Sequence, residues 1–185
     1  MPSSFRKAAD LIGRSQRLFD TDPRSPQVLR LAGSLKVFDH GAAWMWTQLQ
    51  ILRGKPADMA IVNFQRLGAA KYALCMWAMA TCVCAYACWS QPLFLIMAPF
   101  SFYLAESQMV FLFPVALDHS SRPFHDSALL TREAGGALYV TLVVIPIALS
   151  MLLGGFVGRG FARSWYVGCM AILIWYEEVR HANAI

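Results

Sequence analysis

The sequence predicts an all-α integral membrane protein with about four transmembrane helices preceded by two amphipathic helices. Composition is the first reason, because 57% of the chain is hydrophobic and only 15% is charged. Soluble domains contain on average about 45–50% apolar residues and about 25% charged residues. The second reason is residues 72–117, whose only Asp, Glu, Lys, Arg or His side chain is Glu106. One crossing takes roughly 20 apolar residues, so this run is long enough for two crossings.

The N-terminal segment, residues 1–55, forms a basic, amphipathic part of the chain. A helix is predicted from Ser3 or Ser4 to about Phe19, since its apolar residues recur on one face and its arginines lie elsewhere. Such a helix lies on a membrane surface or docks on another helix. Residues 25–26, Ser followed by Pro, start a second helix, and Gly54 ends it.

This second helix, predicted over residues 26–53, carries a continuous apolar stripe. The members of the stripe are Val28, Leu31, Leu35, Phe38, Ala42, Met45, Leu49 and Leu52. They follow one another at steps of three and four residues, which is typical of a helix that packs along another helix. The stripe is expected to face the chain's own spans or the bilayer, with a coiled-coil partner as the alternative.

Residues 56–185 are predicted to form a transmembrane helical bundle. The spans are expected near residues 69–89, 93–117, 136–158 and 161–176. The first span continues a helix that begins near residue 56, with Arg66 and Lys71 at the membrane entrance. The last span is short for a crossing. Three spans plus a buried or re-entrant helix are therefore the alternative.

The distribution of basic residues predicts the orientation. Residues 1–71 contain 11 of the 16 Lys and Arg residues. Four spans bring both termini to one side, and the positive-inside rule places that side in the matrix or the cytosol. The expected location is the mitochondrial inner membrane or the bacterial cytoplasmic membrane. The basic N-terminal helices would lie along anionic lipid headgroups, and nucleic acid is not an expected partner.

Glu106 is the sharpest single candidate for a functional residue. A carboxylate in the middle of a span costs about 2.5–3.5 kcal/mol, so it needs a partner. The structural interpretation pairs it with Ser101, Ser107, Gln108 or a neighbouring subunit. The functional interpretation makes it a proton-relay site or a contact for an ion or substrate.

A polar loop after the second span is the only dense cluster of polar side chains. It contains Asp118, His119, Arg122, His125 and Asp126. Histidine and aspartate can bind zinc or act as acid and base. The two histidines are six positions apart, however, and so would not share a helix face. A solvated, capped turn is the favoured interpretation, with no metal or catalytic role.

No catalytic arrangement of residues is apparent in the sequence. The predicted function is therefore that of a non-catalytic accessory subunit of a larger membrane complex, such as a respiratory complex or an ATP synthase. Other membrane subunits would be its partners, without a cofactor but with room for bound structural lipids. Two alternatives stay open: a small membrane enzyme or transporter centred on Glu106, and a membrane-shaping protein that inserts its amphipathic helices into one leaflet.

Overall fold

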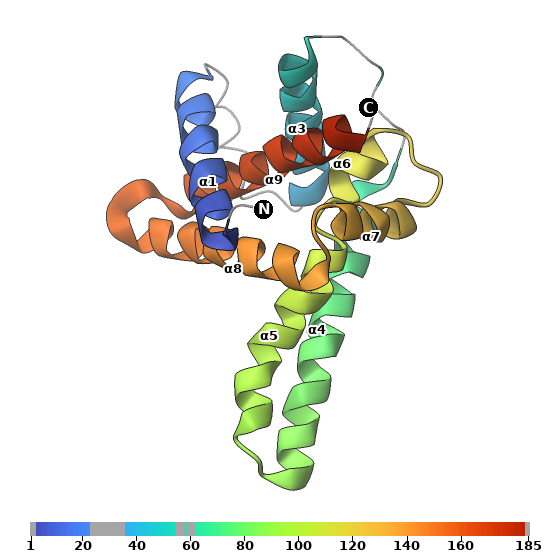
Figure 1. Ribbon diagram of the computed structural model, residues 1–185, viewed down its shortest axis with the longest axis vertical. Coiled ribbons are helices and arrows are strands. Elements are labelled where there is room, and N and C mark those ends of the chain that lie inside the picture. The colour runs from blue at the N-terminus through green and yellow to red at the C-terminus, as the bar shows by residue number, and fades with distance from the viewer. Residues whose placement is uncertain (1–2, 23–35, 55–57, 59–61, 184–185) are drawn as a thin grey trace.

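The computed structural model describes residues 3–22, 36–54, 58 and 62–183. Within these residues all regular secondary structure is helical, which confirms the all-α prediction. The helices are α1 (Ser4–Thr21), α3 (Val37–Arg53), α4 (Phe64–Trp89), α5 (Leu93–Gln108), α6 (Leu112–Leu117), α7 (Pro123–Glu133), α8 (Ala137–Gly154), the short η1 (Gly155–Arg159) and α9 (Phe161–Asn183). Figure 1 shows that α4 and α5 form a long hairpin, which projects from a head made by the other helices.

Three segments of the described chain are long and apolar enough to cross a membrane. They are Phe64–Trp89, Leu93–Leu117 and Ala137–Gly158. These segments agree with the first three predicted spans. The fourth predicted span, 161–176, falls in α9, which is not among them. Because α9 carries four charged side chains and is largely buried in the head, the alternative in which this segment is a buried helix describes it better.

The first helix of the hairpin begins later than predicted. Val62 and Asn63 are not helical, and the Asn63 side chain caps α4 by accepting a hydrogen bond from the Arg66 N–H at 2.9 Å. The 26 residues of α4, at about 1.5 Å each, make a helix of roughly 39 Å. At its far end Ser90 adopts a left-handed conformation with φ 52°, which lets the chain turn back into α5.

A break between α5 and α6 fastens the hairpin to the head. Pro114 has no N–H to offer the carbonyl four residues earlier, and the chain leaves the helix at 109–111. The break directs Phe111 into the core, where it is fully buried. Its ring lies edge-on to that of Trp175 in α9, with centroids 5.5 Å apart.

The first helix docks on its own chain. Ala8, Leu11 and Phe19 on α1 are buried in the core that α8 and α9 also build. Lys7 and Arg14 both pair with Glu178 of α9, which adds ion pairs to the apolar contact. The amphipathic pattern of α1 thus reflects packing within the head.

Helix α8 lies across the base of the hairpin rather than alongside it (Figure 1). After α8 the chain reverses into α9 at Gly158 and Gly160, whose φ values of 79° and 81° favour glycine. The three apolar segments therefore do not form a parallel bundle. Large apolar side chains remain exposed along α8 and η1: Leu138, Leu142, Leu149, Leu152, Leu153, Phe156 and Val157.

The apolar stripe predicted over residues 26–53 is described only in its second half. Val28, Leu31 and Leu35 lie outside the described residues. In α3, Leu49 is fully buried, whereas Leu52 is exposed. Phe38 stacks on Tyr72 of α4 and Phe113 of α6, with ring centroids 5.8 and 6.0 Å apart. The remaining members, Ala42 and Met45, are buried and half-buried, so this half of the stripe packs mainly on the chain itself.

Candidate functional site

Glu106 forms an ion pair with Lys71 inside the hairpin. The Lys71 Nζ lies 3.3 Å from Glu106 Oε1, and the two side chains are only 8% and 16% exposed. The same ammonium lies 5.5 Å from the centroid of the Tyr72 ring, within range of a cation–π contact. The carboxylate therefore finds its counter-charge on the neighbouring helix. Ser101 and Ser107 instead donate hydrogen bonds to backbone carbonyls.

The sequence positions of Lys71 and Glu106 could have suggested this ion pair. Lys71 and Glu106 lie on opposite sides of the turn at Gln91, each well over a dozen positions from it. A helical hairpin brings such positions to similar depths, because both arms rise by the same distance per residue. Only the register of the two helices, set by packing, decides that the side chains meet.

A cavity of about 360 Å³ lies beside this ion pair, where the hairpin joins the head. Its walls come from α3, α4, α5, α6, α8 and α9, and most of the lining side chains are aliphatic or aromatic. The charged groups in the lining are those of Lys71 and Glu106, with Tyr103 next to them on α5. A cavity of this size and composition is typical of sites for small organic molecules.

Trp44 lines the cavity and carries an unsatisfied buried donor. Its ring packs edge-on to Tyr166 with centroids 4.9 Å apart. The indole Nε1 is buried and has no acceptor among the described residues. Buried polar groups are nearly always hydrogen-bonded. The indole N–H is therefore a buried donor whose partner the described chain does not supply.

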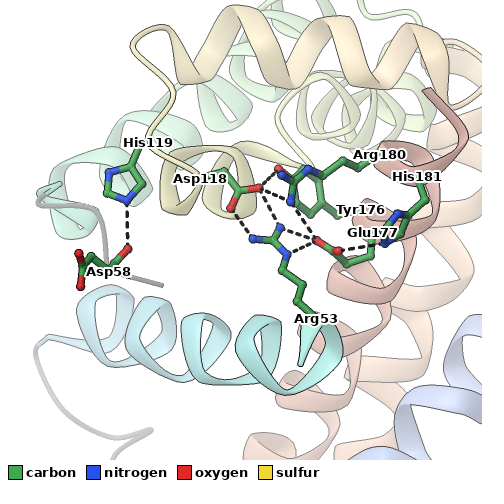
Figure 2. Close-up of polar contacts among 8 residues, drawn as sticks. All are labelled: Arg53, Asp58, Asp118, His119, Tyr176, Glu177, Arg180 and His181. Atoms are coloured by element: carbon green, nitrogen blue, oxygen red, sulfur yellow. Dashed lines mark hydrogen bonds and ion pairs between the residues drawn. The ribbon is translucent and has the colours of Figure 1, made fainter. Parts of the chain in front are cut away.

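A second polar centre, shown in Figure 2, joins α3 to α6 and α9. Arg53 donates to both carboxylate oxygens of Asp118, at 2.7 and 2.8 Å, and through Nε to Glu177 Oε1 at 3.0 Å. Tyr176 donates to Asp118 at 2.6 Å, and Arg180 lies 3.2 Å from the same oxygen. We call these residues the Arg53 network. The positive charges of Arg53 and Arg180 equal in number the negative charges of Asp118 and Glu177.

The network determines how Asp118 titrates. Burial alone raises the pKa of Asp118, but hydrogen bonds from Arg53 and Tyr176 and the charges of Arg53 and Arg180 outweigh it. The pKa of Asp118 therefore lies below its ordinary value of 3.8. Burial also lowers the pKa of Arg53, yet its two carboxylate partners more than compensate and raise it. Both groups stay charged over the whole neutral range.

The other residues of the predicted polar loop do not join this network. His119 has a positive φ of 60°. Its ring is directed away from the network, toward the backbone carbonyl of Asp58, with Nε2 and the oxygen 3.0 Å apart (Figure 2). Arg122 precedes α7, and its backbone N–H donates to Ser120 Oγ at 3.0 Å. The structure thus places Asp118 in the Arg53 network and leaves His119 and Arg122 outside it.

The end of the loop forms an exposed cap. Asp126 accepts a hydrogen bond from Ser120 Oγ at 2.5 Å and lies 3.0 Å from His125 Nδ1. The hydrogen bond from His125 and the one from Ser120 lower the pKa of Asp126. These contacts stabilise the start of α7 and match a solvated turn.

Sequence reasoning missed Arg53, Tyr176 and Arg180 as partners of Asp118, and Glu177 as the second carboxylate that pairs with Arg53. Arg53 lies far before Asp118 in the chain, and the other three lie equally far after it. No local spacing rule connects such distant positions.

No known protein family, curated protein or solved structure matches the chain.

Proposed function

We propose that this chain is a non-catalytic accessory subunit of a larger membrane assembly, anchored by the α4–α5 hairpin. One observation carries the proposal: the apolar helices are far more extensive than the chain itself can cover. In the apolar stretch of α4 only 6% of the residues are buried within the chain. In the apolar stretch of α8 the share is only 33%. Lipid or other subunits must cover the rest, because uncovered apolar surface of this extent marks membrane or protein contacts.

The proposal leads to an expected native mass for the protein extracted from its own membranes in mild detergent. The 20.6 kDa chain should migrate with an assembly several times larger, and respiratory complexes and ATP synthase are the first candidates for it. Ile51→Glu, at an exposed apolar position of α3, should weaken this association. Ala43→Glu, at another exposed position of α3, is the matched control. Migration of the wild type as a monomer or small homo-oligomer would contradict the proposal.

We also propose that only the hairpin crosses the membrane and that α8 lies in the plane of the interface. Helix α8 runs across the hairpin (Figure 1), so the two cannot both follow the membrane normal. Its exposed leucines then face lipid from one side, as in interfacial helices. Two crossings keep α1 and α9 on one side, which the positive-inside rule assigns to the matrix or the cytosol.

Cysteine labelling distinguishes this topology from a third crossing. Leu138→Cys and Leu153→Cys, at exposed positions near the two ends of α8, are each introduced into a variant whose five native cysteines are replaced by serine or alanine. With sealed vesicles of one orientation, a membrane-impermeant maleimide should label both positions from the same side. Labelling from opposite sides would show that α8 crosses.

The membrane-shaping alternative has less support. Most of the apolar face of α1 is buried within the head, at Ala8, Leu11 and Phe19. Of the large apolar residues on this helix, Phe5 and Leu18 are the exposed ones. Two side chains offer little area for insertion into a leaflet.

A further inference from the structure

We infer that the cavity at the base of the hairpin binds a single-chain lipid with an uncharged polar head. The occupant would be one hydrocarbon chain that ends in hydroxyl or ester groups, as in a monoacylglycerol. The inference goes beyond the proposed subunit role and does not depend on it, because every group it uses belongs to this chain. Only the route by which the ligand enters rests on the proposed position of α8 in the membrane interface.

The body of the cavity suits a hydrocarbon chain. Its volume of about 360 Å³ lies within the range of about 300–1,000 Å³ usual for small-molecule sites. The lining is dominated by aliphatic and aromatic side chains: Phe38, Met45, Val144, Ile147, Met151 and Leu173. Burial of an apolar chain against such walls is favoured by the hydrophobic effect.

The rim of the cavity points to the bilayer as the source of the ligand. Leu152, Phe161 and Trp165 line the cavity and are also among the exposed large hydrophobic residues. They continue the apolar surface of α8 and η1, which we place in the membrane interface. An apolar molecule can therefore reach the cavity without passing through water.

The polar end of the cavity selects an uncharged head. The Lys71 ammonium lies 3.3 Å from Glu106 Oε1 as an ion pair. The ammonium carries three donors and the carboxylate two acceptor oxygens, so both groups keep hydrogen-bonding capacity for a ligand. A hydroxyl can accept from Lys71 and donate to Glu106. A charged head would add a net charge to a buried, balanced pair, which is unfavourable.

Two glycines provide a matched pair of variants for the test. Gly41 lines the cavity, whereas Gly13 lies on α1 outside its lining. A Cβ atom at either position would meet no heavy atom within 4 Å. Both glycines lie inside helices, where leucine is favoured over glycine. Gly41→Leu should therefore fill the cavity, and Gly13→Leu should leave it open, with neither lowering the thermal midpoint.

The experiment measures binding of radiolabelled monolaurin to the purified full chain in detergent. The wild type and Gly13→Leu should bind it saturably, and Gly41→Leu should bind roughly tenfold more weakly or worse. Equal binding by Gly41→Leu, or non-saturable binding by the wild type, would overturn the site. Laurate has the same chain with a charged head, so laurate binding as tight as that of monolaurin would overturn the assignment of the head.

A double variant tests the polar anchor. Lys71→Met combined with Glu106→Leu removes both charged groups and should weaken monolaurin binding about tenfold, because hydrogen bonds to charged groups are stronger than neutral ones. Unchanged affinity in a folded double variant would show that the ion pair does not hold the head.

Discussion

Replacement of Arg53 by methionine should lower the free energy of unfolding by about 3 kcal/mol. The substitution removes the cation that lies closest to both Asp118 and Glu177, and only the half-exposed Arg180 remains near the two carboxylates. Removal of one partner of a buried pair costs about 3–5 kcal/mol. The lower value is used because Arg53 is still 18% exposed. For a chain of this length, such a loss corresponds to a fall in the thermal midpoint of roughly 6–12 °C. Thermal unfolding in detergent, followed by circular dichroism, measures it.

Arg163→Met is the control for this experiment. Arg163 lies 2.7 Å from Asp20, but the two side chains are 30% and 51% exposed. Exposed pairs contribute about 0.2–1 kcal/mol, so the control should cost far less than Arg53→Met. Equal losses for the two variants would refute the special role of the Arg53 network.

The network also predicts a dependence on acid. The pKa of Asp118 is lowered in the folded state. Its contribution to stability is therefore complete above the unfolded value, near pH 4, and is lost as the pH falls through the lowered folded value. Asp118→Asn should remove this part of the acid sensitivity. The thermal midpoints of the wild type and of Asp118→Asn are measured between about pH 7 and pH 3. An equal fall in both proteins would contradict the assignment of this acid sensitivity to Asp118.

The second large effect is expected at Lys71. Lys71→Met leaves Glu106 as an unpaired carboxylate, 16% exposed, within a membrane segment. The expected loss of stability is about 3–5 kcal/mol. Adding Glu106→Leu should restore most of it, because replacing both members of a buried pair by apolar residues is often neutral. Thermal unfolding of the two variants in the same detergent makes the comparison.

Arg66→Met provides the reference for a change of charge alone. Arg66 is on the same helix but is exposed, so its loss should change stability by no more than about 0.5 kcal/mol. If the double variant were as unstable as Lys71→Met, the damage would come from lost packing of the lysine stem and not from the orphaned carboxylate.

The three segments that are long and apolar enough to cross a membrane could be predicted because their signal is local. A long run without charges, such as residues 72–117, identifies itself by composition. The Gly54 cap, with φ 64°, and the proline break before α6 follow from the chemistry of single residues. The start of α4 was predicted too early, because capping by Asn63 and by Asp39, which accepts from the Gln65 N–H at 3.1 Å, competes with helix propensity.

The candidate site was predictable only in part. Glu106 was conspicuous because one carboxylate in an apolar run demands a partner. Lys71, assigned to the membrane entrance, is the partner that helix packing supplies. The apolar first part of α9, residues 161–176, suggested a short fourth span, since periodicity does not separate a buried helix from a crossing one. Its burial depends on α1, which comes from the opposite end of the chain.

The Lys71–Glu106 pair has a consequence for how the protein is made. The lysine leaves the ribosome well before the glutamate, with the rest of α4 and most of α5 between them, so α4 is synthesised while its counter-charge is still missing. A lone charge in the bilayer costs about 2.5–3.5 kcal/mol, and the neutralised pair avoids much of this cost. The two helices are therefore best released into lipid together, as one preassembled unit, after the second has emerged.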